Sequence, residues 1–155
     1  MTHVPLAELP EYMRNVMATL ALERNNTKAV ILALKGELGA GKTTFVQALA
    51  KQMGVTEHVQ SPTYVLMKKY ALPTGLNPFG HQRRFKTLIH IDAYRLKNAE
   101  EFAALKPEEF LNDPSALVLI EWPERVEGAL PEPDRVLRFV SEGAQEGERF
   151  IDIEK

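Results

Sequence analysis

GELGAGKT, at residues 36–43, is the stretch of sequence that decides the fold of this chain. It matches the pattern G-x-x-x-x-G-K-[ST] of a phosphate-binding loop at every fixed position. Glycines allow the backbone to curl around an anion and to turn its N–H groups inward. The expected nucleotide contacts are Glu37, Leu38, Gly39, Ala40, Gly41, Lys42, Thr43 and Thr44.

Two side chains of this loop predict the chemistry of the ligand. Lys42 supplies a mobile cation for the β- and γ-phosphates, and the Thr43 hydroxyl is a hard oxygen ligand for Mg²⁺. A helix that begins near Lys42 adds its positive N-terminal end to the same site. The loop therefore predicts a nucleotide, ATP or ADP, together with Mg²⁺.

The segments on either side of the loop make the match specific. AVILAL, at residues 29–34, is a continuous apolar run and predicts a strand that is buried on both faces. FVQALAKQM, at residues 45–53, predicts a helix that stops at Gly54. Strand, glycine loop and helix in this order favour phosphate binding over an incidental glycine-rich turn.

The remaining segments predict a mixed α/β architecture. A first helix is expected from Glu11 to Arg24, and one or two short helices from Asn98 to Leu111, interrupted at Pro107. Residues 63–72 and 85–96 have strand character, and the Pro- and Gly-rich loop between them predicts an antiparallel hairpin. Further strands are expected at 115–120, 135–140 and 150–153. We therefore expect one domain over residues 1–155, a P-loop NTPase three-layer sandwich around a mixed central sheet.

Two acids stand at the ends of apolar strands. Asp92 ends TLIHID, and Glu121 ends ALVLIE. Because the carboxyl ends of strands line the ligand crevice of an open α/β sheet, either acid can hold the metal, with the other acting in hydrolysis. For each acid, a helix cap or a structural ion pair is the competing interpretation.

Four other residues have weaker signals. Ser61 and Thr63 flank a proline between the helix after the loop and the next strand, where nucleotide switches often carry a hydroxyl that senses the γ-phosphate. A plain turn has equal weight there. His90 alternates with isoleucines, which favours a core histidine over a catalyst. Trp122, the only tryptophan, should lie near the nucleotide if Glu121 is at the metal.

Composition narrows the setting. The chain has 155 residues, a formal net charge of −2 and no cysteine, so disulfides and Cys-based zinc sites are excluded. A slightly acidic domain has no global electrostatic reason to bind nucleic acid directly. We see no signal peptide at the N-terminus and no apolar run near the ~20 residues that span a membrane. A cytoplasmic setting without membrane contact is expected.

Four segments in order resemble the TsaE family, also called YjeE. They are GELGAGKTTFVQAL, SPTYVL, HIDAYRL and LIEWPERV, within a resemblance that runs from about Ala29 to Val140. The resemblance implies a small P-loop ATPase, slow when alone, that binds ATP and Mg²⁺. It also implies that the protein acts with TsaD and TsaB in the t6A modification of adenosine 37 of tRNA, reaching tRNA through that complex.

The resemblance also implies roles for individual residues. Lys42 and Thr43 keep the phosphate-loop roles, and Glu121 becomes the Mg²⁺ ligand beside Thr43. Asp92 becomes a candidate for positioning water or acting as a base. Ser61 and Thr63 become the switch region, and Trp122 a neighbour of the nucleotide. The sequence departs from the family in its N-terminal segment and in the longer loop from Pro73 to Arg84.

Three other functional classes have less support in the sequence. A small-molecule kinase needs an acceptor pocket and usually an Arg-rich lid, for which we find no segment, so it stays the second choice. A guanine-specific GTPase usually carries N-K-x-D, which does not occur in this sequence, so adenine is favoured. A non-catalytic nucleotide-binding module is disfavoured by the two acids at strand ends.

Overall fold

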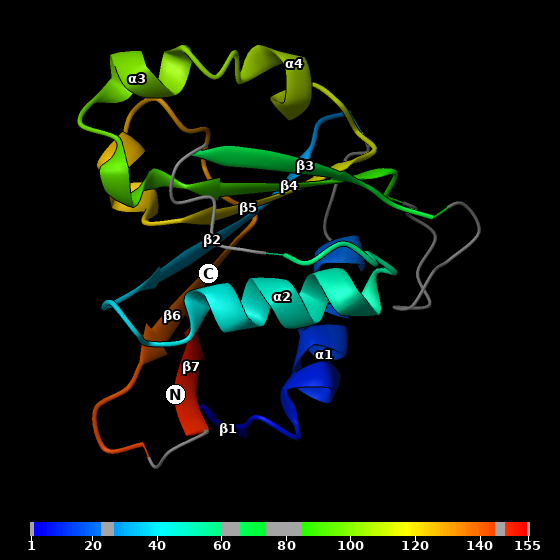
Figure 1. Cartoon of the computed structure of the whole chain (residues 1–155), viewed down its shortest axis with the longest axis vertical. Coiled ribbons are helices and arrows are strands. Elements are labelled where there is room, and N and C mark those ends of the chain that lie inside the picture. The colour runs from blue at the N-terminus through cyan, green and yellow to red at the C-terminus, as the bar shows by residue number, and fades with distance from the viewer. Residues whose placement is uncertain (1, 23–26, 60–65, 74–84, 145–147, 155) are drawn as a thin grey trace.

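A mixed β-sheet forms the centre of the protein. The computed structural model describes residues 2–22, 27–59, 66–73, 85–144 and 148–154. Within these ranges the sheet has seven strands in the order β1-β7-β6-β2-β5-β4-β3 (Figure 1). The strands are β1 (Thr2–Pro5), β2 (Val30–Gly36), β3 (Met67–Ala71), β4 (Thr87–Asp92), β5 (Ala116–Glu121), β6 (Arg135–Val140) and β7 (Glu148–Ile153).

The centre of the sheet is parallel and both edges are antiparallel. Strand β2 lies between β5 and β6 and runs parallel to both, and β4 continues the parallel part beyond β5. Strand β3 closes one edge as a hairpin with β4, and β7 and β1 close the other edge. All six residues of β5 are buried, as expected for a parallel strand covered on both faces.

Helices cover both faces of this sheet and give three layers. On one face lie α1 (Leu9–Leu22) and α2 (Lys42–Gln52). On the other lie the short helices α3 (Ala99–Ala103) and α4 (Glu108–Leu111) with the 3₁₀ turns η1 (Ala93–Arg95) and η2 (Pro123–Val126) (Figure 1). Alternate residues of β2, together with the residue just before it, pack into two separate hydrophobic cores. Val30, Leu32 and Leu34 face α1 and α2, whereas Ala29, Ile31 and Ala33 face the other side.

The predicted fold class is confirmed. The structure has the expected mixed sheet, three layers and antiparallel hairpin, in which Tyr70 of β3 pairs with Leu88 of β4. The central part of the loop between these strands, 74–84, lies outside the described residues. The first helix begins at Leu9, earlier than expected, because Pro10 is tolerated in a first turn, where the missing N–H has no helical partner. No helix among the described residues is both long and apolar enough to cross a membrane.

Two local predictions were wrong. The strand expected to reach residue 96 ends at Asp92, and Ala93–Arg95 form the 3₁₀ turn η1. The Asp92 side chain caps this turn by accepting a hydrogen bond from the Tyr94 backbone N–H at 3.1 Å, and this local bond ends the strand. Strand β1 was missed because it has four residues, including a proline, and takes its order from pairing with β7.

Candidate functional site

The segment Gly36–Thr43, called here the glycine-rich loop, joins the end of β2 to the start of α2. All three of its glycines have backbone conformations that other residues rarely adopt, with φ of +139° at Gly36, +80° at Gly39 and +96° at Gly41. A Cβ at Gly36 would overlap the backbone carbonyl oxygen of Phe139, and a Cβ at Gly41 would overlap the guanidinium group of Arg149. Backbone conformation therefore favours glycine at all three positions, and contact with a backbone atom adds to this at Gly36.

A cavity of about 320 Å³ opens beside this loop. That volume is at the lower end of the range for small-molecule sites. Its lining comes from the loop, the start of α2, the ends of β4 and β5, and η1. The lining residues are Leu38, Gly39, Gly41, Lys42, Thr43, Thr44, Asp92, Tyr94, Arg95 and Glu121. Six of the eight predicted contact residues at the loop and the start of α2, all except Glu37 and Ala40, thus meet both predicted acids at this cavity, although β4 and β5 lie far from the loop in sequence.

Thr43 and Glu121 form a direct contact in this cavity. The Thr43 hydroxyl lies 3.1 Å from each carboxylate oxygen of Glu121 and donates to them. Glu121 is 3% exposed, so its carboxylate is held in a fixed place at the end of β5. A hydroxyl and a carboxylate at this separation are suited to share one Mg²⁺, which prefers hard oxygen ligands and completes its shell with phosphate oxygens and water.

No group of three or more His, Cys, Asp and Glu side chains that could hold a metal is found among the described residues. An all-protein metal cage is therefore not seen in this part of the chain.

His90, for which the sequence favoured a core histidine over a catalyst, is fully buried and also contacts Glu121, a contact that the sequence did not indicate. Its Nε2 lies 2.8 Å from Glu121 Oε1, and the imidazole is fully buried. Because a carboxylate can only accept, the proton of this bond is on Nε2. The two-residue repeat of a strand could have indicated this contact. His90 and Asp92 are two residues apart on β4 and so lie on the same face. β4 and β5 are adjacent parallel strands, with Asp92 opposite Glu121.

Lys42 folds back onto its own loop. Its ammonium group donates to the carbonyl oxygens of Gly36 at 2.6 Å and Glu37 at 2.8 Å, and lies 4.2 Å from the centre of the Trp122 ring. Burial lowers the pKa of Lys42 from its ordinary value. The carboxylates of Glu121, Glu124 and Asp92 act in the opposite direction and raise that pKa. Lys42 thus contacts the loop and Trp122, and it interacts electrostatically with Glu121 and Asp92.

The other predicted residues have mixed outcomes. Asp92 lines the cavity but also caps η1, so both interpretations of this acid find support. Trp122 packs against Lys42 and against Tyr94, whose ring centre lies 5.0 Å away, which places the indole beside the glycine-rich loop. Ser61 and Thr63 lie outside the described residues, so their predicted switch role stays a prediction.

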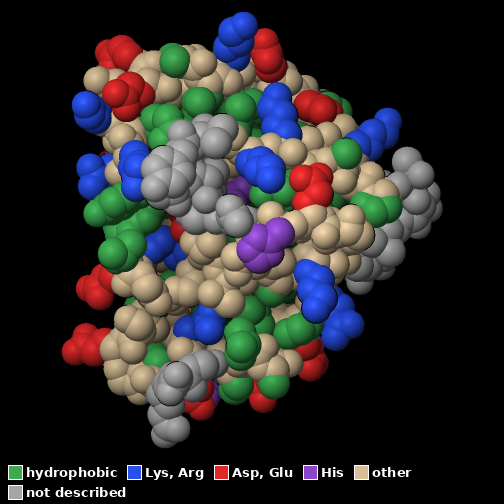
Figure 2. All heavy atoms as spheres, in the orientation of Figure 1, with side chains coloured by type: hydrophobic (Ala, Val, Ile, Leu, Met, Phe, Trp, Pro, Cys, Tyr) green, Lys and Arg blue, Asp and Glu red, His purple; other side chains and the backbone are tan. Residues whose placement is uncertain are grey.

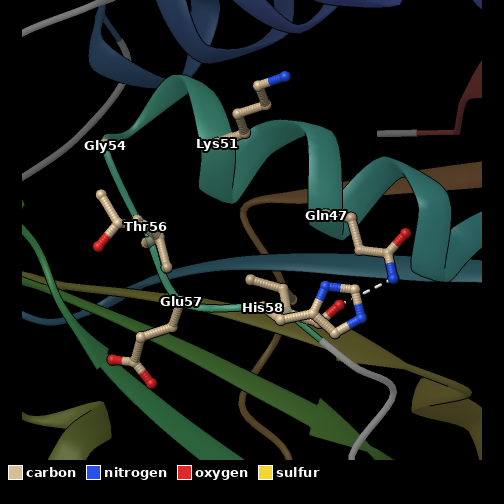
Figure 3. Close-up of a pocket in the computed structure, with 8 residues that line it drawn as sticks. Gln47, Lys51, Gly54, Thr56, Glu57 and His58 are labelled. Atoms are coloured by element: carbon tan, nitrogen blue, oxygen red, sulfur yellow. Dashed lines mark hydrogen bonds between the residues drawn. The ribbon is translucent and has the colours of Figure 1, made fainter.

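A larger cleft of about 650 Å³ lies beyond the opposite end of α2 (Figure 3). Its lining residues are Gln47, Lys51, Gly54, Val55, Thr56, Glu57, His58 and Val59. The Gln47 amide spans part of it by donating to the Val59 carbonyl at 2.8 Å. It contains none of the predicted phosphate or metal ligands, so the smaller cavity at the glycine-rich loop is the candidate site.

Comparison with known proteins gives a consistent result. A family profile described as "Threonylcarbamoyl adenosine biosynthesis protein TsaE" matches residues 8–151. The chain is 35% identical over 117 residues to the tRNA threonylcarbamoyladenosine biosynthesis protein TsaE of Haemophilus influenzae, covering 76% of this chain and 66% of the relative. The protein of the same name from Treponema pallidum is 37% identical over 118 residues, covering 75% and 78%. That from Bacillus subtilis is 35% identical over 121 residues, covering 78% and 66%.

A solved structure is also similar. The crystal structure of Bacillus subtilis YdiB superposes with a TM-score of 0.56 at 26% sequence identity, covering 97% of this chain and 80% of that one. The aligned stretch spans just under two thirds of the length of the H. influenzae and B. subtilis relatives, at 66% in both cases.

Proposed function

This chain belongs to the TsaE family of threonylcarbamoyl adenosine biosynthesis, and from that premise we propose that it is a Mg²⁺-dependent, ATP-binding protein and slow ATPase. The observation that carries this proposal is the contact of Thr43 with Glu121 at 3.1 Å, beside the glycine-rich loop. Two hard oxygen ligands beside the loop support the binding of Mg²⁺ next to the phosphates of a nucleotide. The backbone N–H groups of the loop and the start of α2 would hold the phosphates.

Lys42 is suited to hold phosphate without disturbing the loop. An ammonium group has three N–H donors, and two of them serve the carbonyls of Gly36 and Glu37. The third is left for a phosphate oxygen in the cavity that Lys42 lines. The lysine would therefore bind nucleotide and brace the loop at the same time.

Glu121 and Asp92 have different roles in the proposed hydrolysis. Mg²⁺ bound by Thr43 and Glu121 would neutralise charge on the phosphates during transfer to water. His90 also hydrogen-bonds the Glu121 carboxylate and acts as a positioning residue. Asp92, at the neighbouring strand end in the same cavity, is the candidate for orienting the attacking water.

We propose that this ATPase supports TsaB and TsaD during t6A modification of adenosine 37 in tRNA. It would act on tRNA through that complex. The family supports the pathway, since the relatives are named for threonylcarbamoyladenosine biosynthesis. On the face shown in Figure 2, the described basic and acidic side chains are interspersed.

Nucleoside analysis of tRNA tests the proposed role. Cells depleted of this protein should lose t6A from tRNA. Expression of the wild-type chain should restore it, and expression of Lys42→Ala should not. Normal t6A levels in depleted cells would overturn the role in the pathway and leave the ATP site to be judged separately.

Nucleotide binding has its own measurement. Since Trp122 packs on Lys42, titration with Mg²⁺ and ADP should change tryptophan fluorescence in a saturable way. Phosphate release from ATP, followed with and without TsaB and TsaD, then tests hydrolysis. Addition of candidate small-molecule acceptors to the same assay distinguishes an ATPase from a kinase.

A further inference from the structure

Four polar or charged side chains are buried among the described residues. They are Lys42, His90, Glu121 and Arg149. The first three meet at the site already described. Arg149, which is 8% exposed, is the one for which neither the sequence motifs nor the proposed chemistry has a role.

Arg149 lies directly behind the glycine-rich loop. It begins the buried part of β7, where it pairs with Val4 of β1, and Ile151, two residues further on, belongs to the core under α1 and α2. A Cβ placed on Gly41 would be 3.1 Å from Arg149 Cζ and 3.5 Å from its Cδ, and closer still to Nη1. The guanidinium group therefore packs against the residue that precedes the first turn of α2.

Among the described residues, no group is seen to compensate the charge of Arg149. Its Nε and Nη1 are buried and have no hydrogen-bond partner within this part of the chain. Burial lowers the pKa of both Arg149 and Lys42, but only for Lys42 do nearby carboxylates act in the opposite direction. Since arginine stays protonated in proteins, a buried cation with two unused donors remains. Such a group is strongly destabilising unless something pairs with its charge.

The position of Arg149 relative to the sheet indicates what that partner is. The glycine-rich loop follows β2. Glu121 and Asp92 stand on the β5 and β4 side of that strand, and Arg149 stands on the β6 and β7 side. A phosphate chain held by the loop would then have the acids and Mg²⁺ on one flank and the guanidinium group on the other. Arg149 does not line the cavity itself, so its effect would be exerted through the loop.

We propose that Arg149 is a second positively charged element of the nucleotide site, held uncompensated behind Gly41 until the phosphates of a bound nucleotide neutralise it. Its charge raises the affinity of the loop for the phosphate chain because the side chain is 8% exposed and packs against Gly41, where solvent screens a charge less than at the surface. It is a positioning residue, since it acts through the loop. This role for Arg149 depends on the proposed nucleotide binding and adds Arg149 to the residues that strengthen it.

The variant Arg149→Met tests this proposal because methionine keeps much of the apolar side chain and removes the charge. ADP affinity with Mg²⁺ should fall about tenfold or more, which corresponds to about 1.4 kcal/mol. The thermal midpoint of the nucleotide-free protein should stay the same or rise, because an uncompensated buried charge is gone. Arg149→Lys should retain more ADP affinity than Arg149→Met. Arg14→Met, the same change at an exposed position on α1, is the matched control and should bind ADP as the wild type does.

The outcomes separate this inference from the proposed function. If the wild type binds ADP and Arg149→Met binds it equally well, the role of Arg149 is overturned and the nucleotide site stands. A lower midpoint of the nucleotide-free Met variant would make Arg149 a structural residue and also overturn the inference. Equal loss in the Lys and Met variants would show that charge is not the cause. A wild-type protein that binds no ADP would overturn the proposed function itself.

Discussion

The carboxylate of Glu121 is held from two sides by neighbouring side chains. The Thr43 hydroxyl donates to both of its oxygens, and the His90 imidazole donates to one of them at 2.8 Å. Each bond is available because the three residues lie on elements that meet at one edge of the sheet. A carboxylate fixed in this way loses little freedom when it binds a metal ion, which favours tight ligation.

Glu121→Gln should separate metal-dependent hydrolysis from nucleotide binding. Glutamine has nearly the same shape and its amide oxygen still accepts from Thr43, but it has no charge with which to hold Mg²⁺. We expect Mg²⁺-dependent ATP hydrolysis to fall about 100-fold or more. ADP binding without Mg²⁺ should change little. Phosphate-release kinetics and fluorescence titration measure the two effects, and unchanged hydrolysis would move the metal to Asp92.

Tyr12 of α1 provides a residue-scale test of pH dependence. Its hydroxyl is buried and has no hydrogen-bond partner among the residues that the structure describes. Burial, and secondarily the charge of Asp152, raises the pKa of Tyr12 from 10.0 to about 12. Folding therefore favours the protonated phenol. The resulting stabilisation is complete below pH 10.0 and is lost as the pH rises toward about 12.

Tyr12→Phe should remove this alkaline loss. Relative to the wild type, the Phe variant should gain free energy of unfolding as the pH rises from 9 to 11, because phenylalanine does not titrate. At pH 7 it should be at least as stable, since no hydrogen bond of the described residues is lost. Urea unfolding at several pH values measures both. A large loss of stability at pH 7 would show that the hydroxyl has a partner in solution.

At the scale of elements, the predictions succeeded where hydrophobic pattern alone determines structure. The buried strands β2 and β5 are continuous apolar runs, and this pattern is visible without any tertiary information. Strand β1 and the end of β4 were not predicted correctly because each is determined by a specific partner. β1 depends on pairing with β7, and β4 ends where the Asp92 side chain caps η1.

Gly36 joins β2 to the glycine-rich loop, and its replacement tests how tightly this junction packs. Alanine at φ +139° is strained, and its Cβ would overlap the backbone carbonyl of Phe139 on β6. Because a backbone atom cannot move aside cheaply, we expect Gly36→Ala to lower the free energy of unfolding by roughly 2–4 kcal/mol. Chemical denaturation with ADP absent measures this loss.

Gly128→Ala is the control for this substitution. Gly128 also has positive φ, at +84°, but a Cβ there meets nothing within 4 Å. Its replacement should cost only the backbone term, about 1 kcal/mol. Equal losses at the two positions would show that contact with β6 adds nothing and that conformation alone explains the requirement for glycine.

At the scale of the whole molecule, the sheet order assembles the site from distant parts of the chain. Lys42 and Thr43, Asp92, and Glu121 come from segments that the sequence motifs identified separately, and the parallel pairing of β2, β5 and β4 places their ends together. His90 and Arg149 were missed because their significance depends on buried contacts between elements. Arg149 contacts the loop from β7, which lies on the opposite side of β2 from β4 and β5. The sequence around Arg149 gives no sign of this contact.

Because these segments surround one cavity, nucleotide binding should stabilise the folded chain as a whole. A ligand that binds only the native state at 100 times its dissociation constant adds about 2.7 kcal/mol, which for a domain of this size raises the melting temperature by roughly 5–10 °C. Calorimetry with Mg²⁺ and ADP should show this shift in the wild type. Lys42→Ala, at the same ADP concentration, should show a much smaller one because it lacks the charge-assisted contact to phosphate. A shift of equal size in both proteins would mean that ADP binds away from the glycine-rich loop, and the cleft at the other end of α2 would then become the place to look for it.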